Sequence, residues 1–69
     1  MKLNTETLID ALRQTYRGQI AVHRANIDVY LSNPAGIGEH PSIVEAIDEE
    51  VGKLAEADEK LETLNKYYP

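Results

Sequence analysis

The feature that most constrains this sequence is one stretch rich in proline and glycine, LSNPAGIGEHPS at residues 31–42, in a chain that otherwise has helical periodicity. Proline removes a backbone donor and glycine adopts positive φ at low cost, so both are typical of turns. The sequence therefore predicts one all-α domain, residues 1–69. It is an antiparallel hairpin with a helix at about 4–33, a turn at 34–41 and a helix at about 42–67. We expect the turn to be formed by Pro34, Gly36, Ile37, Gly38 and Pro41.

An anion-binding loop is the alternative interpretation of this stretch, because the first N–H groups of a helix are free to bind an anion. However, Glu39 is acidic, and no Lys or Arg lies within the stretch. The spacing of Gly36 and Gly38 also matches no glycine-rich phosphate motif. We therefore favour a turn in which Ile37 covers the end of the helix pair.

The first helix has a capping signal at its start and a stop signal at its end. Asn4 can accept a hydrogen bond from a free N–H of the first turn, and Leu3 and Leu8 occupy the positions of a hydrophobic staple. Asn33 should end the helix, because a residue that precedes proline disfavours the helical conformation.

The second helix has two candidate starting points. Proline suits a first helical position, which favours a start at Pro41. Alternatively Ser42 is the N-cap, and Glu45 completes a capping box three residues later. The sequence does not decide between these two starting points.

Apolar residues recur every three or four positions in both predicted helices, which is the spacing of one helical face. In the first helix the face comprises Leu12, Tyr16, Ile20, His23, Ile27 and Tyr30. In the second it comprises Ile43, Ile47, Glu50, Leu54, Ala57, Leu61, Leu64 and Tyr68. When the helices are aligned antiparallel, facing residue numbers sum to 73 or 74 in every layer, so that Ile9 faces Leu64 and Tyr16 faces the small Ala57. One register therefore matches all the layers, which supports the hairpin.

The same register places His23 opposite Glu50, the one polar layer in an otherwise apolar seam. A polar pair of this kind commonly fixes register, and we favour that role. A pH switch or half of a metal site in a dimer is the alternative, although the Glu-x-x-His repeats of di-metal bundles are absent. The register also places Arg17 beside Glu56 and Arg24 beside Glu49 as weak flanking pairs.

A second stripe on the first helix predicts self-association. A chain of 69 residues without cysteine has a marginal core of its own and no disulfide to reinforce it. The second stripe lies about 130° round from the first on a helical wheel, and the second helix adds Val44, Val51 and Ala55 beside its seam. We expect a homodimeric four-helix bundle; a monomeric hairpin with helix-favouring alanines is the alternative. The stripe comprises Ala11, Thr15, Gly18, Val22, Ala25 and Val29.

Composition argues against several functional classes. The net charge of −5 argues against nucleic acid, and no apolar run approaches the length of a membrane span. No signal peptide is evident, so we expect a cytoplasmic protein. The serines Ser32 and Ser42 have no evident base, so we assign no catalytic residue, cofactor or metal and expect a protein that is not an enzyme. Tyr67 is the freer of the two C-terminal tyrosines and a candidate anchor for a partner, whereas Tyr68 should continue the seam.

The sequence NIDVYLSNPAGIGEHPSIVEAIDEEVGKLAEADEKLETLNKYY, residues 26–68, resembles a family of small uncharacterised proteins encoded by contractile-tailed phages of marine cyanobacteria. The likeness is sharpest in VYLSNPAGIGEHP. It implies a phage setting, in the infected cell or the virion, and carries no assigned activity or site residue. Taken together, the residues and the resemblance leave three interpretations of the function. The first is an interaction module that binds itself and a host or phage protein, the second is a structural or assembly component of the virion, and the third is a metal- or small-ligand-binding bundle.

Overall fold

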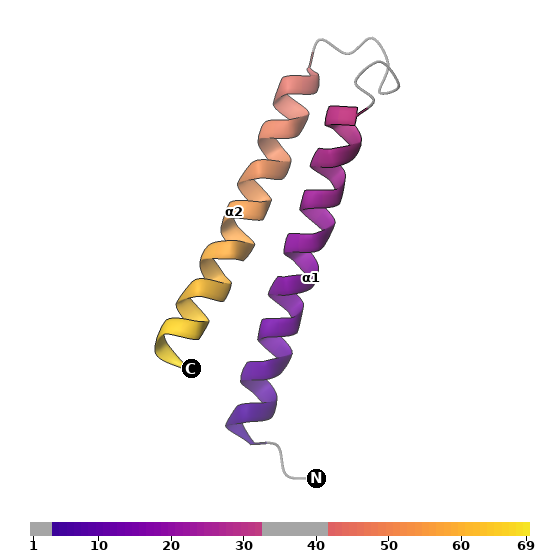
Figure 1. Ribbon diagram of the computed structural model, residues 1–69. Helices are drawn as coiled ribbons and strands as arrows, with labels where there is room; N and C mark the ends of the chain where they lie inside the picture. The colour runs from indigo at the N-terminus through magenta and orange to yellow at the C-terminus, as the bar shows by residue number, and fades with distance from the viewer. Residues whose placement is uncertain (1–3, 33–41) are drawn as a thin grey trace.

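The structure is a computed structural model that describes residues 4–32 and 42–69. Helix α1 spans Thr5–Ser32 and helix α2 spans Ile43–Tyr67. The two helices run antiparallel side by side, so that the start of α1 and the end of α2 lie at one end of the pair, and the end of α1 and the start of α2 lie at the other (Figure 1). The predicted all-α hairpin is therefore confirmed, with helix ends within one or two residues of those expected. The predicted turn residues, Pro34 to Pro41, lie outside the described residues.

The start of α1 agrees with the sequence prediction. The side-chain oxygen Oδ1 of Asn4 accepts a hydrogen bond of 2.7 Å from the backbone N–H of Thr7. This bond satisfies one of the N–H groups that have no partner within the first turn, so Asn4 is the N-cap. Leu3 lies outside the described residues, and the predicted staple with Leu8 is therefore untested.

The start of α2 differs from one prediction. Ile43 is the first helical residue and Ser42 is the N-cap, whose carbonyl accepts the N–H of Ala46 at 2.9 Å. However, the Ser42 side chain makes no capping hydrogen bond. Its backbone, at φ −97° and ψ 18°, lacks the extended conformation that directs a cap hydroxyl toward the first turn. The predicted capping box with Glu45 is therefore wrong.

The shared seam of the two helices follows the predicted periodicity with one shift. On α1 every buried or half-buried residue falls at alternating steps of four and three, which is an unbroken heptad. Position 13 belongs to this heptad and position 12 does not, so the prediction of Leu12 in the seam is wrong: Leu12 is 41% exposed, whereas Arg13 is half-buried. The half-buried residues of α1 are Ile9, Arg13, Tyr16, Ile20, His23, Ile27 and Tyr30.

Helix α2 contributes the most buried part of the molecule. Ala57, the small residue predicted opposite Tyr16, is 2% exposed, and Leu64 is 9% exposed. The prediction that Tyr68 continues the seam is wrong, because the helix ends at Tyr67 and the Tyr68 side chain is 55% exposed. The remaining half-buried residues of α2 are Ile43, Ala46, Ile47, Glu50, Leu54 and Leu61.

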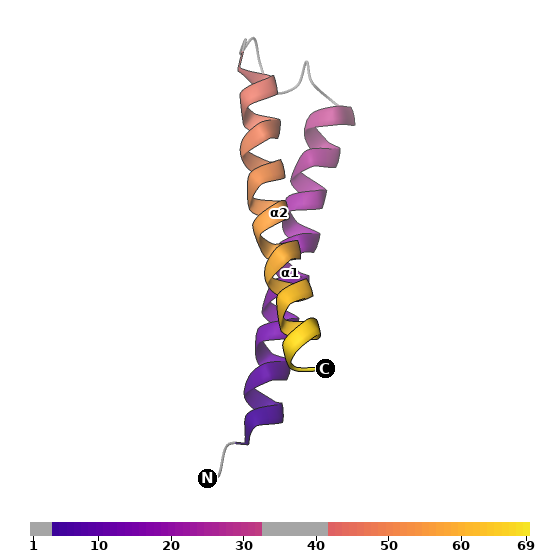
Figure 2. The same ribbon diagram turned by 90° about the vertical axis from the view of Figure 1, so that its left-hand side faces the viewer.

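The hairpin is elongated and thin. Its extents are 53 × 23 × 14 Å and its radius of gyration is 16.0 Å, against about 11 Å for a compact domain of this length. The smallest extent is close to the diameter of one helix. A view turned by 90° shows α1 and α2 crossing each other, one in front of the other near the middle of the pair (Figure 2). Two helices in a single layer can cover each other on one side only, so most of each helix surface stays exposed.

Candidate functional site

The polar layer predicted at the middle of the seam is present. Nδ1 of His23 lies 2.6 Å from Oε2 of Glu50, and the two side chains are 18% and 13% exposed. An ionised carboxylate can only accept, so the imidazole donates this bond. Because the pair joins residues 27 positions apart, it confirms directly that the helices meet in the predicted register.

The environment of Glu50 favours its charged form. The hydrogen bond from His23 lowers the pKa of this carboxyl most, and the Asn26 side chain lowers it further. Partial burial acts in the opposite direction, whereas the coulombic effects of the Lys53 ammonium and of the His23 ring in its protonated form add to the lowering. Glu50 is therefore a charged acceptor on α2 that takes its hydrogen bond from His23 of α1.

A metal site at this layer would need more donors than the pair itself supplies. A structural or catalytic metal usually takes at least three protein ligands. Within the described ranges, no three His, Cys, Asp or Glu side chains are grouped so that they could hold an ion. The geometry of one chain accordingly fits a register pair, and this role stays a prediction.

The second predicted stripe is an open face of α1. We call Leu8, Ala11, Thr15, Gly18, Val22, Ala25 and Val29 the outer face; all seven are exposed. Leu8, Val22 and Val29 are 52%, 56% and 59% exposed, although they are among the larger apolar side chains of α1. With Arg13 in the seam, the outer face lies about 140° from the seam at 100° per residue. It therefore points almost directly away from α2.

The hydroxyl groups on and beside the outer face are already satisfied. Thr15 donates to the carbonyl of Ala11 at 2.9 Å, and Ser32 donates to the carbonyl of Asp28 at 2.8 Å. Each bond lies within α1 itself. Covering these side chains would therefore leave no unpaired donor, which removes the usual cost of burying a hydroxyl.

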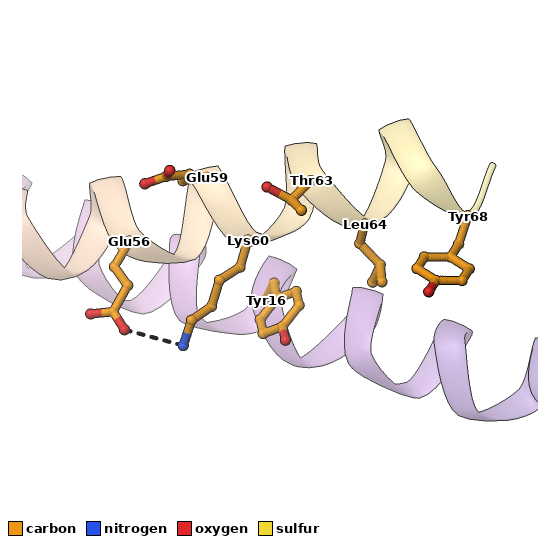
Figure 3. A pocket seen from close by; sticks show the side chains of 7 residues that line it. All are labelled: Tyr16, Glu56, Glu59, Lys60, Thr63, Leu64 and Tyr68. Carbon is orange, nitrogen blue, oxygen red and sulfur yellow. Dashed lines mark ion pairs between the residues drawn. The ribbon is translucent and has the colours of Figure 1, made fainter.

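A surface groove lies near the C-terminal half of α2 (Figure 3). It has a volume of about 360 Å³, and Tyr16 from α1 meets Lys60 and Leu64 from α2 there. The ammonium of Lys60 lies 3.1 Å from a carboxylate oxygen of Glu56 and 5.8 Å from the Tyr16 ring centroid. The cation is thus already paired within the chain, and the groove offers an anionic ligand no free positive charge.

Arg13 joins α1 to the C-terminal end of α2, a role that the sequence did not predict. Its Nε donates to Oδ1 of Asn65 at 2.9 Å, and its guanidinium also donates to the backbone carbonyl of Tyr68. A cation at a helix C-terminus satisfies free carbonyls and interacts well with the helix dipole. The sequence held only a weak signal, because position 13 continues the heptad of the other seam residues but hydropathy favours the neighbouring Leu12.

The arginine pairs predicted on the flanks of the seam are not formed. Neither Arg17 nor Arg24 has a carboxylate within ion-pair distance in the part of the chain that the structure describes. Glu56 is instead paired with Lys60, four residues away on its own helix. Side chains at i and i+4 are neighbours on the surface of one helix, so this pair needs no contact between the two helices.

The comparisons with protein-family models, curated proteins and solved structures found no match to this chain, so the fold and the geometry of the site are what bear on function. None of the helices in the described residues has the length and apolar character needed to cross a membrane.

Proposed function

We propose that the protein is a homo-oligomeric helical interaction module that acts without catalysis. Two hairpins associate into a four-helix assembly, and the assembly binds a host or phage protein. The observation that carries this proposal is the outer face of α1. It is an exposed, uncharged face on the back of a hairpin that buries little of its own surface.

The surface area of the chain supports association. The hairpin exposes 5424 Å², whereas a compact monomer of 7.7 kDa exposes about 4,300 Å². The excess of about 1,100 Å² is comparable to the roughly 800 Å² that each partner buries in a standard protein interface. Among the described residues, Ala57 and Leu64 are the only buried side chains, so the single chain has almost no core. A second hairpin would supply one.

The charge distribution supports a further partner. Residues 42–69 carry eight acidic and three basic side chains, whereas residues 1–33 carry three acidic and four basic ones. An assembly that covers α1 leaves the acidic α2 at its surface. A basic surface on a partner protein would complement it and would be attracted over about 10 Å at physiological salt.

Analytical ultracentrifugation of matched variants tests the proposal. The chain should sediment as a dimer at micromolar concentration, and Val22→Glu should raise the dissociation constant about a hundred-fold by burying an unpaired carboxylate. Val44→Glu is the control, because Val44 is 72% exposed but lies on α2. It should leave the dimer intact. A wild-type chain that stays monomeric and folded at all concentrations would refute the proposal.

A structural or assembly component of a phage particle is the second candidate. The likeness of residues 26–68 to proteins of contractile-tailed phages motivates it, and the rod-like shape, 53 Å long, suits a spacer. Quantitative proteomics of purified particles separates the two functions. Presence at fixed stoichiometry supports the virion component, whereas recovery in the infected-cell extract with a bound protein supports the interaction module.

A further inference from the structure

The backs of the two helices, which point away from the shared seam, differ in charge. The outer face of α1 carries no charged side chain. The matching positions of α2 carry four glutamates and one lysine, and they are all exposed. We call this set the acidic back of α2; it comprises Glu45, Glu49, Gly52, Glu56, Glu59, Thr63 and Lys66.

This contrast selects which faces can meet in a dimer. Contact between the outer face of α1 and the acidic back of α2 in a second copy would bury carboxylates against apolar side chains. Contact between two acidic backs would place like charges together. Contact between two outer faces buries no charge. The occupant that best fits the outer face is therefore the same face of a second copy.

Gly18 provides an independent indication of close approach. A Cβ added at Gly18 would meet nothing within 4 Å, so the hairpin itself gives no reason for glycine there. Glycine inside a helix is unfavourable relative to alanine, but it lets another helix approach closely. Gly52 has equally open surroundings, and the hairpin does not explain it either. Three of its four neighbours one turn away are acidic, namely Asp48, Glu49 and Glu56, so no apolar stripe runs through it.

We propose that two copies pair through their outer faces with the α1 helices antiparallel, so that a two-fold axis passes at the level of residue 20. This inference rests on the proposed self-association. In this register the facing residue numbers sum to 40, and each layer sets a larger side chain against a smaller one. The layers are Leu8 with Ser32, Ala11 with Val29, Thr15 with Ala25, and Gly18 with Val22.

A parallel pair would fit less well. It would set Gly18 against Gly18 and Ala11 against Ala11 of the second copy, and these layers would leave unfilled space between the helices. The Val22 and Val29 layers would meanwhile hold two branched side chains each and would keep the helices apart. The antiparallel pair has neither problem, and it leaves both α2 helices on the outside with their acidic backs exposed.

Disulfide trapping distinguishes these arrangements, because the chain has no cysteine of its own. In the antiparallel register, Ala11 of one chain faces Val29 of the other, whereas the two Ala11 positions are about 27 Å apart along the axis. A disulfide needs Cα atoms within about 7 Å. Ala11→Cys chains mixed with tagged Val29→Cys chains should therefore form the mixed disulfide at least ten-fold more than either variant forms a disulfide with itself.

The control is Glu59→Cys mixed with Ala11→Cys, which should not cross-link because Glu59 lies on the acidic back of α2. Efficient self-linking of Ala11→Cys would overturn the inference in favour of a parallel pair. A dimer that cross-links in neither arrangement, or that links Glu59→Cys instead, would also overturn it. Each variant is first sedimented in reductant. A monomer at that step means that self-association itself, and not the register, has failed.

Discussion

The sharpest test of close helix approach uses the two helical glycines as matched sites. Gly18 and Gly52 each lie inside a helix, and an added Cβ would meet nothing within 4 Å at either one. If the single hairpin were the whole fold, Gly18→Leu and Gly52→Leu would be equivalent. Each would increase the free energy of unfolding by about 0.5–1 kcal/mol through helix propensity alone.

The antiparallel dimer makes the two substitutions unequal. Gly18 faces Val22 of the second copy in two symmetry-related layers, and overpacking a filled layer costs about 1–3 kcal/mol. The two layers together cost at least about 2 kcal/mol per dimer. Since 1.4 kcal/mol changes an equilibrium constant ten-fold, Gly18→Leu should raise the dissociation constant about thirty-fold or more. Gly52→Leu should leave the dissociation constant unchanged and keep the gain in helix stability.

Sedimentation equilibrium measures the dissociation constants, and urea unfolding followed by circular dichroism at two chain concentrations measures stability. Two concentrations are needed because the stability of a dimer depends on concentration. Equal stabilisation by both substitutions with no change in association would refute the reasoning. Tighter association of Gly18→Leu would also refute it. An added apolar side chain strengthens an interface that is apolar but loosely packed, and weakens one that is closely packed.

Two further predictions concern the seam. The folded-state pKa of Glu50 is lowered from 4.5, so its stabilising contribution is complete above about that pH and is lost as the pH falls through the lower folded value. The unfolding free energies of wild type and Glu50→Gln, measured in urea from pH 7 to pH 3, should therefore differ at neutral pH and converge on acidification; a gap that does not change with pH would contradict this reading. Ala57→Leu, at a site 2% exposed, should lower the free energy of unfolding by about 1–3 kcal/mol, whereas Ala55→Leu, exposed on the same helix, should change it by less than about 0.5 kcal/mol. Equal effects in thermal or urea unfolding would show that Ala57 is not tightly packed.

The sequence by itself determined the local features of the fold. Periodicity and the proline-glycine stretch were sufficient for two helices and their antiparallel order, because helical spacing and turn chemistry act over a few residues. The pairing of His23 with Glu50 was also predictable, because a heptad seam allows few registers once one apolar layer is matched. The N-cap at Asn4 was confirmed for the same local reason.

The tertiary structure decided which residues occupy the ends of the seam and where the outer face points. Hydropathy alone favoured Leu12 over Arg13, but the geometry of the heptad places position 13 against α2, where the arginine stem is covered and its guanidinium reaches the carbonyl of Tyr68. Because the seam includes Arg13 and not Leu12, it lies farther round the helix from the outer face than the sequence predicted. The outer face therefore points away from α2. A helical wheel drawn from sequence gives the stripes of one helix, but only the packed pair shows which stripe the partner helix leaves exposed.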